Sequence, residues 1–278
     1  MIGLSYHSDR TLADRALDRM LAGPRSAVDL AREVMGLAQA SPVIAERLAI
    51  ALLGADPRVC QLSDGRWAAV TAARHIASLR DCTFAVVDVE TTGMRSRMDD
   101  RITEIAIVTV NNGVVKLAFD SLINPERYIP PRITSVTGIT NEMVARAPRF
   151  AEVSDAVMAA LSGRIFVAHN ARFDWNFVDA ELRRARDLVL SGPRLCTVRL
   201  ARRLVMGVQS CGLDSLTHFF GWENQARHRA AGDALVTAQL LNRLIQLASD
   251  RGAHTVDDLV SISTLPRRRF REMWALNQ

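Results

Sequence analysis

Cysteine is scarce in this 278-residue sequence, and long apolar runs are absent from it. The four cysteines lie far apart, without the two-residue spacing of a zinc knuckle, which favours reduced, packed thiols over metal ligands or disulfides. No stretch approaches the roughly 18 uninterrupted apolar residues of a membrane span. Residues 1–10 lack the basic and apolar segments of a secretion signal. These absences predict a cytoplasmic protein without a membrane segment.

Lysine is nearly absent as well: of the 35 basic residues, only Lys116 is a lysine. The net charge of +5 and the pI near 9.5 favour an anionic partner such as a nucleic acid, because each cation that meets a phosphate releases a condensed counterion. Arginine suits bidentate phosphate contacts. A GC-rich genome would produce the same arginine bias, and this explanation is preferred, so the arginine excess by itself identifies no partner.

Residues 1–70 are predicted to form a small α+β domain that resembles a winged helix, with three helices followed by a hairpin. Ser26, with Asp29 three residues later, can form a capping box. Ser41 followed by Pro42 is typical of a helix start. The expected helices cover residues 9–21, Ser26 through Leu37 and Ser41 through Leu53, and the expected strands cover 58–62 and 66–70.

The third helix and the wing of a winged helix often contact DNA. Here the third expected helix is mostly apolar, and Arg47 is the one basic residue along its length. An apolar surface suits packing or protein contact as well as DNA binding, so both roles stay open for residues 1–70.

Residues 71–82 are interpreted as a connector, and residues 83–250 as an α/β domain with a mixed sheet flanked by helices. The Asn111-Asn-Gly sequence favours a two-residue hairpin turn, and Pro130-Pro131 is interpreted as a break. The expected strands cover residues 83–89, 103–110, 114–123, 165–168 and 195–198, and the expected helices cover 153–161, 174–185 and 233–248.

Residues 251–278 are expected to form a basic helical C-terminal tail. The run Arg267-Arg-Arg-Phe-Arg and the nearby Trp274 combine cations with aromatic rings, as surfaces that bind single strands do. A solvated helix end explains the same residues and is the preferred interpretation.

Four carboxylates in residues 83–250 lie on faces that should point inward. Asp88 and Glu90 are two residues apart at the end of an apolar strand, which puts both on one face. Asp174 and Asp233 each lie at the start of an expected helix and share its apolar side. Ionised carboxylates rarely point inward unless they are paired or bound to metal.

Few nearby cations offer these four carboxylates a partner. Like charges about 4 Å apart repel by a few kcal/mol even at an effective dielectric constant of about 20. Convergence of the four without compensation would therefore raise their pKa values. Divalent cations remove this conflict, and ligands that offer only oxygen suit Mg²⁺ or Mn²⁺. The sequence thus predicts a divalent metal site.

Three segments around these carboxylates resemble the exonuclease motifs of the DEDDh family, which includes the DnaQ-like proofreading epsilon subunit of bacterial DNA polymerase III. The segments are Asp88-Val-Glu90-Thr-Thr-Gly, His169-Asn-Ala-Arg-Phe-Asp174 and His228-Arg-Ala-Ala-Gly-Asp233. They occur in the family's order and spacing over residues 83–248, with Thr137-Gly-Ile-Thr between the first two. Any one motif could arise by chance, whereas the three together are specific.

The resemblance implies a ribonuclease H-like sheet, two Mg²⁺ or Mn²⁺ ions, and hydrolysis of the terminal phosphodiester in the 3′ to 5′ direction. Carried over to this sequence, Asp88 bridges both ions, Glu90 and Asp233 complete the more catalytic metal site, and Asp174 supports the second ion through water. His228 takes a proton from the attacking water, a role that suits an imidazole.

The same resemblance places Thr91, Thr92 and Gly93 beside the 3′ nucleotide, with Gly93 letting backbone approach closely. It also places Ile139 against the terminal base. His169 matches the second motif, but it is interpreted as a structural residue whose hydrogen bond to backbone fixes its loop.

The function predicted from these residues is that of a metal-dependent 3′–5′ exonuclease that trims single-stranded or frayed DNA 3′ ends in proofreading or repair. RNA 3′-end trimming is the alternative, because RNA-trimming relatives share these residues. A catalytically silent DNA-binding or scaffold protein is the alternative of another class, and the complete set of five residues argues against it. No long C-terminal tail and no clear clamp-binding peptide is seen, so a stand-alone enzyme is as well supported as association with a polymerase or repair complex.

Overall fold

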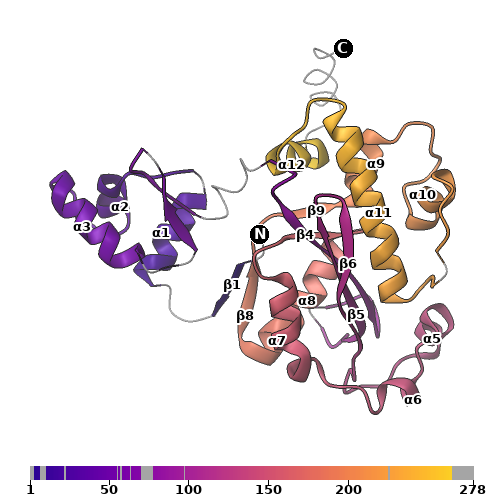
Figure 1. Ribbon diagram of the computed structural model, residues 1–278. Helices are drawn as coiled ribbons and strands as arrows, with labels where there is room; N and C mark the ends of the chain where they lie inside the picture. The colour runs from indigo at the N-terminus through magenta and orange to yellow at the C-terminus, as the bar shows by residue number, and fades with distance from the viewer. Residues whose placement is uncertain are drawn as a thin grey trace. The chain divides into compact units, whose positions relative to one another are not determined.

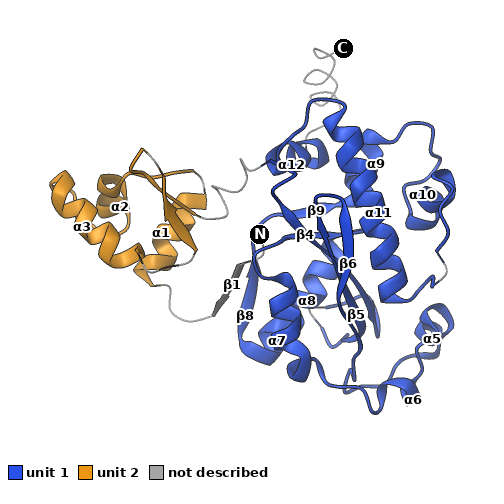
Figure 2. Ribbon diagram, viewed as in Figure 1, with its two compact units in different colours: residues 1–6, 78–278 blue, residues 7–77 orange. Residues whose placement is uncertain are grey.

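The computed structural model describes residues 3–6, 11–21, 23–54, 56, 58–62, 64–69, 78–96, 98–224 and 226–264. The chain divides into two compact units, one of residues 7–77 and one of residues 1–6 with 78–278 (Figure 2). Each unit has a buried apolar core of its own.

The smaller unit contains the helices and the hairpin that the sequence predicts. They are α1 (Leu12–Leu21), α2 (Ala27–Glu33), α3 (Pro42–Leu53), and the antiparallel strands β2 (Val59–Gln61) and β3 (Trp67–Ala69). Side chains start two of the helices as expected. The Asp29 N–H donates to Ser26 Oγ at 3.1 Å, and the Ile44 N–H donates to Ser41 Oγ at 3.4 Å.

Helix α3 buries small side chains and exposes large apolar ones. Ala45 and Ala49 are fully buried in the core of the smaller unit. Val43 is 65% exposed, and Ile44 and Ile50 are 53% and 51% exposed. The outer surface of α3 is therefore apolar rather than basic.

The larger unit is built on a mixed sheet with strand order β6-β5-β4-β7-β9 (Figure 1). The strands are β4 (Thr83–Thr91), β5 (Ile102–Asn111), β6 (Val114–Leu122), β7 (Ile165–Ala168) and β9 (Arg194–Cys196). Strand β5 pairs antiparallel with β4 and β6, while β4, β7 and β9 run parallel. The β5–β6 hairpin turns at Asn112 and Gly113, whose φ angles of 44° and 81° suit the expected two-residue turn.

Helices cover both faces of this sheet, as Figure 1 shows. They are α5 (Pro131–Thr137), α6 (Asn141–Val144), α7 (Phe150–Leu161), α8 (Arg172–Arg186), α9 (Thr197–Leu204), α10 (Leu213–Phe219), α11 (Ala230–Ser249) and α12 (Val256–Thr264). Helices α7 and α8 share a core with Val87 and Val89 of β4. Because side chains alternate along a strand, Asp88 and Glu90 point to the other face, where α11 packs against β4 and β5.

Helices α5 and α6 were not expected from the sequence. Helix α5 begins at Pro131, in the proline pair that was interpreted as a break. Proline is accepted in the first turn of a helix, because its missing N–H has no partner there in any case. Thr140 starts α6 by accepting a hydrogen bond from the Met143 N–H at 3.3 Å.

The N-terminal strand belongs to the larger unit and not to the small domain expected over residues 1–70. Strand β1 (Gly3–Tyr6) pairs antiparallel with β8 (Leu188–Ser191). Neither strand was expected, because each is four residues long and its partner lies far away in the sequence. The pairing places the smaller unit between two segments of the larger one along the chain.

The stretch after α11 also joins the larger unit. Helix α12 packs against α9 and β9, and its Leu259 and Ile262 are fully buried, so it is not part of a separate tail. Residues 71–77 of the expected connector and the basic run at 267–274 lie outside the described residues. Within the part of the chain that the structure describes, no helix is both long and apolar enough to cross a membrane.

Candidate active site

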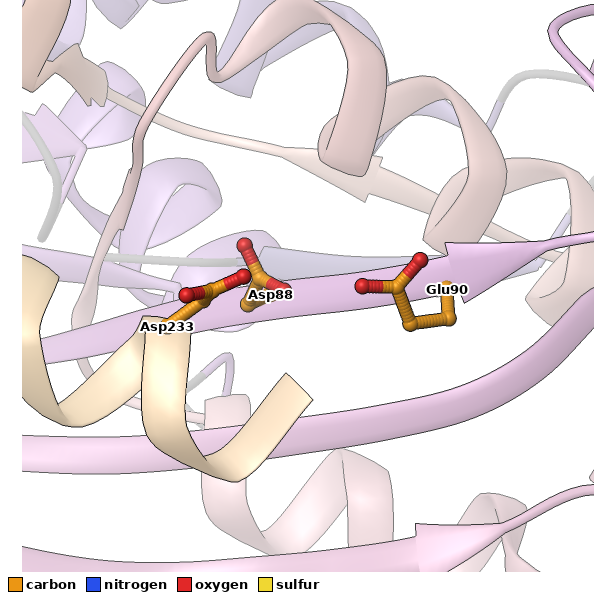
Figure 3. Close-up of side chains that lie close together, drawn as sticks. All are labelled: Asp88, Glu90 and Asp233. Carbon is orange, nitrogen blue, oxygen red and sulfur yellow. The ribbon is translucent and has the colours of Figure 1, made fainter. Parts of the chain in front are cut away.

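Strand β4 and helix α11 together supply three of the expected site residues. Asp88 and Glu90 point from β4 toward the face that α11 covers, and Asp233 lies in the first turn of α11 (Figure 3). One oxygen from each carboxylate lies within 4.8 Å of the other two, a spacing that could hold a metal ion. All three residues are partly exposed, so the cluster is open to an ion and to a substrate.

Asp174 reaches the same region from α8. It lies in the first turn of that helix and is 3% exposed. The backbone N–H of Val89 donates a hydrogen bond to its carboxyl group, and its charge raises the pKa of Asp88. Asp174 is not a member of the three-carboxylate cluster found among the described residues. The fourth expected acid therefore lies beside Asp88 and outside the cluster.

Burial raises the pKa of all four carboxyl groups, and repulsion within the group adds to the shift at Asp88 and Glu90. The pKa of Glu90 rises to about 8, first through burial and then through the charges of Asp233 and Glu104. Burial raises the pKa of Asp174 to about 8, and burial with the charge of Asp174 raises the pKa of Asp88 well above its usual value. Burial also raises the pKa of Asp233. A divalent cation would replace the protons and stabilise the ionised cluster.

The donor set of the cluster fits a hard divalent cation. Its ligand atoms are all carboxylate oxygens, which Mg²⁺ and Mn²⁺ prefer. Structural zinc sites normally include nitrogen or sulfur ligands. The residues present therefore fit the ions that the sequence predicts.

The loop before α11 holds Asp233 in place. Asn224 Nδ2 donates to Asp233 Oδ1 at 2.5 Å, and the backbone N–H of His228 donates to Asp233 Oδ2 at 3.2 Å. His228 has a φ of 58°, which is uncommon for a residue with a side chain. Gly232 lets the loop approach the helix, because a Cβ there would lie 2.3 Å from the carbonyl oxygen of Ala226.

The sequence did not predict two hydrogen-bonded pairs at this site, Asn224 with Asp233 and Arg229 with Glu104. Nothing in the local pattern around Asn224 indicates a bond to a residue nine positions later. Glu104 pairs across the sheet with Glu90 and binds Arg229. The sequence did contain one sign that Glu104 has a special role, because this charged residue lies within the largely apolar strand that begins at Ile102.

His169 makes contacts with a neighbouring side chain and with backbone. Its Nδ1 lies 2.9 Å from Thr197 Oγ1, and the ring also has a hydrogen bond with the backbone of Cys211. Burial lowers the pKa of His169 to about 4, while the backbone of Cys211 opposes this shift. The imidazole is therefore neutral at physiological pH.

The loop after Glu90 is held together by its own side chains. Thr91 Oγ1 donates to the Gly93 carbonyl at 2.6 Å. Thr92 Oγ1 donates to Asp100 Oδ1 at 3.3 Å and accepts from the Arg101 N–H at 3.0 Å. A Cβ on Gly93 would lie 2.4 Å from Asp100 Oδ2. The space beside Gly93 is thus filled by the carboxylate of Asp100.

Ile139 is not at the surface in this structure. Its side chain is fully buried and packs with Ile129 and Val144 in a small core of its own. Gly138 precedes it with a φ of 72°, which ends α5 and turns the chain inward. In this arrangement Ile139 supports the segment, and the contact with a terminal base that the resemblance implies stays a prediction.

Comparison with known proteins identifies the family. The RNase_T family model, described as Exonuclease, matches residues 85–241. A DNA polymerase III subunit epsilon-like protein of Rhodobacter capsulatus is 39% identical over 198 residues, which are 69% of this chain and 28% of that protein. The DNA polymerase III subunit epsilon of Aquifex aeolicus is 30% identical over 193 residues, which are 69% of this chain and 94% of that protein. The chain therefore spans less than a third of the Rhodobacter relative.

A solved structure is similar to this chain in both fold and sequence. Exonuclease X in complex with 5′ overhanging duplex DNA has a TM-score of 0.50 and 29% sequence identity, covering 65% of this chain and 99% of that one. The mixed sheet flanked by helices is that of ribonuclease H-like exonucleases, and the matched residues include Asp88, Glu90, Asp174 and Asp233. The chain belongs to the DnaQ-like DEDDh exonuclease family, and its larger unit is a nuclease domain.

Proposed function

We propose that the protein is a divalent-metal-dependent 3′–5′ exonuclease that removes nucleotides from DNA 3′ ends by two-metal hydrolysis. The observation that carries this proposal is the cluster of Asp88, Glu90 and Asp233 with Asp174 beside it. Acids with raised pKa values in an open cluster are suited to bind cations. Membership in an exonuclease family supports phosphodiester hydrolysis as the reaction.

The four acids divide between two ions in this proposal. Asp88, Glu90 and Asp233 would hold one ion, and Asp88 with Asp174 would serve the second. When bound, the two ions would stabilise the negative charge on the attacking and leaving oxygens. Asn224 and the backbone N–H of His228 orient Asp233, and the N–H of Val89 orients Asp174.

His228 is the proposed general base. It directly precedes Arg229, the N-cap residue of α11, and its own backbone N–H binds the Asp233 carboxylate, which keeps the residue beside the cluster. The side chain is partly exposed and therefore accessible to water. An imidazole in this place would take the proton from the attacking water.

DNA is the proposed substrate, and the names of two similar proteins support it. The similar epsilon subunit is named as part of DNA polymerase III, and the similar Exonuclease X structure contains DNA. The proposed contacts of the 3′ nucleotide are with the loop of Thr91, Thr92 and Gly93, which directly follows Glu90. Single-stranded or frayed ends would fit the open cluster best.

The substrate and the direction can be tested together. Oligonucleotides of DNA and RNA, and matched and mismatched DNA primer–templates, would carry a 5′ label and be incubated with the purified protein and Mg²⁺, Mn²⁺ or EDTA. We expect metal-dependent shortening from the 3′ end, fastest for single-stranded DNA and mismatched primers. Faster cleavage of RNA would make the protein an RNA-trimming enzyme, and cleavage of a 3′-blocked DNA at an unchanged rate would refute the direction.

The site can be tested by substitution. Asp88→Asn and His228→Ala should each lower kcat. For His228→Ala the expected loss is about 100- to 10,000-fold, the range for loss of a general base. Asp155→Asn, at a side chain that is 73% exposed on α7, is the control and should keep the activity of the wild type. Full activity in both site variants would show that the proposed site is wrong. An inactive wild type that still binds DNA would favour a silent nuclease domain that binds or scaffolds DNA.

Association with a DNA polymerase or a repair complex is a further part of the proposal, supported by the epsilon-type relatives. Affinity purification of the full chain under native conditions would test it. Recovery of a polymerase subunit in stoichiometric amount would support proofreading. Recovery of active exonuclease without any such subunit would favour stand-alone end trimming or repair.

A further inference from the structure

Glu104 holds the start of α11 from within the sheet. Its Oε1 accepts hydrogen bonds from Arg229 Nη2 at 2.5 Å and from Arg229 Nε at 3.0 Å. Its Oε2 accepts a bond from the backbone N–H of Ala230 at 2.9 Å. One carboxylate therefore binds the side chain of the residue that follows His228 and the backbone of the next residue.

The position of Glu104 connects this contact to the carboxylate cluster. Glu104 on β5 is the direct register partner of Glu90 on β4, so both side chains share the face on which α11 lies. The side chain of Glu104 is 3% exposed, and β5 is buried from residue 102 to 108. The same rigid pair of strands thus carries Asp88 and Glu90 and anchors the helix that carries Asp233.

His228 has a backbone conformation that needs support from its surroundings. Its φ of 58° lies in the left-handed region, which persists in a residue with a side chain only where neighbouring contacts enforce it. Its own N–H is bound to Asp233. Immediately after it, Arg229 and Ala230 are bound to Glu104. The contacts to Glu104 therefore fix the chain on the C-terminal side of His228.

Arg229 also separates Glu104 from the cluster. Glu104 raises the pKa of Glu90 by its charge, and Arg229 lowers it. With its oxygens engaged by Arg229 and Ala230, Glu104 is kept from acting as a fifth ligand among the acids. The ion pair thus leaves the cluster with the composition that the proposed mechanism uses.

We propose that Glu104 and Arg229 are positioning residues, which set the places of His228 and Asp233 relative to Asp88 and Glu90 without contacting the substrate. The inference rests on the proposed function, because it takes His228 as the general base. Loss of the ion pair should act on the chemical step, so kcat should fall. KM for the oligonucleotide should change little, because the loop after Glu90 has its own hydrogen bonds.

A second buried glutamate provides a matched control. Glu181 on α8 is 1% exposed and accepts hydrogen bonds from Arg101 Nε at 2.7 Å and Nη2 at 3.0 Å. It also accepts a bond from the N–H of Ile102, the next residue, at 3.3 Å. Like Glu104, Glu181 therefore binds one arginine side chain and the backbone N–H of the residue after that arginine. The contacts of Glu181 lie at the start of β5 and not at the start of α11. Loss of the Glu181 carboxylate should lower the stability of the protein without moving His228.

The test compares Glu104→Gln with Glu181→Gln in the chain of 278 residues. Both variants lose a buried charge, so their thermal unfolding midpoints should fall by similar amounts. For Glu104→Gln, kcat on a single-stranded DNA oligonucleotide should fall about 10- to 100-fold, the range for loss of a residue that orients a metal-site side chain. KM should stay near the wild-type value, and Glu181→Gln should keep a kcat near that of the wild type. Equal kcat values in the two variants would overturn the proposal.

Substitution of Arg229 gives an independent measurement. Lysine keeps the positive charge but not the planar fork of donors, so Arg229→Lys should retain more kcat than Arg229→Gln. Glu104→Gln combined with Arg229→Gln should lose no more kcat than the more affected single variant, because the two groups act as one unit. Losses that multiply in the double variant would overturn the proposal.

Failure of the proposed function gives a different result from failure of this inference. An active wild type with an equally active Glu104→Gln variant would refute the positioning role alone. If the wild type hydrolyses neither DNA nor RNA with Mg²⁺ or Mn²⁺, the proposed function is wrong, and backbone amide exchange in residues 226–234 then decides. Faster exchange there in Glu104→Gln than in Glu181→Gln supports the anchor, and equal exchange overturns it.

Discussion

At the scale of single residues, the acids of the site connect pH to stability. The folded protein holds protons on Glu90 and Asp174 up to a pKa of about 8. In the unfolded chain such groups are ionised above about pH 5. Since the folded state binds more protons in this window, the free energy of unfolding should fall as the pH rises toward 8. His169 acts in the opposite direction only below its unfolded pKa of about 6.5, because its folded pKa is lowered to about 4.

Thermal unfolding of the metal-free protein should therefore show a lower midpoint at about pH 8.5 than at about pH 6.5. Each pKa unit corresponds to about 1.4 kcal/mol, so the change should be measurable by calorimetry. Mg²⁺ or Mn²⁺ should raise the midpoint more at the higher pH, because the ions compete with protons. Asp174→Asn should weaken the pH dependence. A midpoint that rises over this range in metal-free protein would contradict the prediction.

Gly93 is a second residue whose role follows from its contacts. In Gly93→Ala the new Cβ would collide with Asp100, which also holds the N–H of Arg95 at 2.9 Å. We expect a loss of about 1–3 kcal/mol of unfolding free energy, as for other overpacked sites, together with a higher KM for DNA. Gly212→Ala is the control, because its Cβ would meet only Ser210 Oγ at 3.6 Å. Equal stability in both variants would show that the loop accommodates the methyl group.

At the scale of elements, the first turn of α11 determines where the preceding loop lies. In Gly232→Ala the new Cβ would collide with the backbone of Ala226, so the loop that carries His228 must move. A displacement of about 1 Å would lower kcat by about 100-fold. Gln239→Ala, at an exposed position of the same helix, should leave kcat unchanged. A Gly232→Ala variant with wild-type kcat would show that the loop tolerates the shift.

The elements that were predicted correctly are those with local indications. Helices α2 and α3 start at Ser26 and Ser41, whose hydroxyls accept bonds from residues three positions later. Strand β7 was predicted with its observed bounds, because its residues form a short apolar run. Strands β1 and β8 were missed. Each is stabilised by pairing with the other, and the two strands lie far apart in the sequence. Local patterns predict an element when its stabilising contacts are local.

At the scale of the whole molecule, all the site residues lie in the larger unit. Replacement of residues 7–77 by a short glycine-serine linker, which keeps strand β1 in the larger unit, should therefore keep exonuclease activity on short oligonucleotides. Because the exposed side of α3 is apolar, we also expect the affinity for single-stranded DNA to change little. Fluorescence anisotropy at several salt concentrations would measure both the Kd and its salt dependence. Weaker binding with a smaller salt dependence would contradict this and assign DNA contacts to residues 7–77.

Spacing along the chain was enough to predict which faces of their elements the four acids occupy. It placed Asp88 and Glu90 on one face of a strand and Asp174 and Asp233 in the first turns of helices, because these relations depend on residues a few positions apart. The folded structure decided how far the acids converge, what fills the space beside Gly93, and that Glu104 holds α11. Glu104 and Arg229 are 125 residues apart, and only the packing of α11 on the sheet brings them together. Contacts between residues so far apart in the sequence depend on how helices and strands pack against one another. The residue pattern within a single helix or strand does not specify that packing.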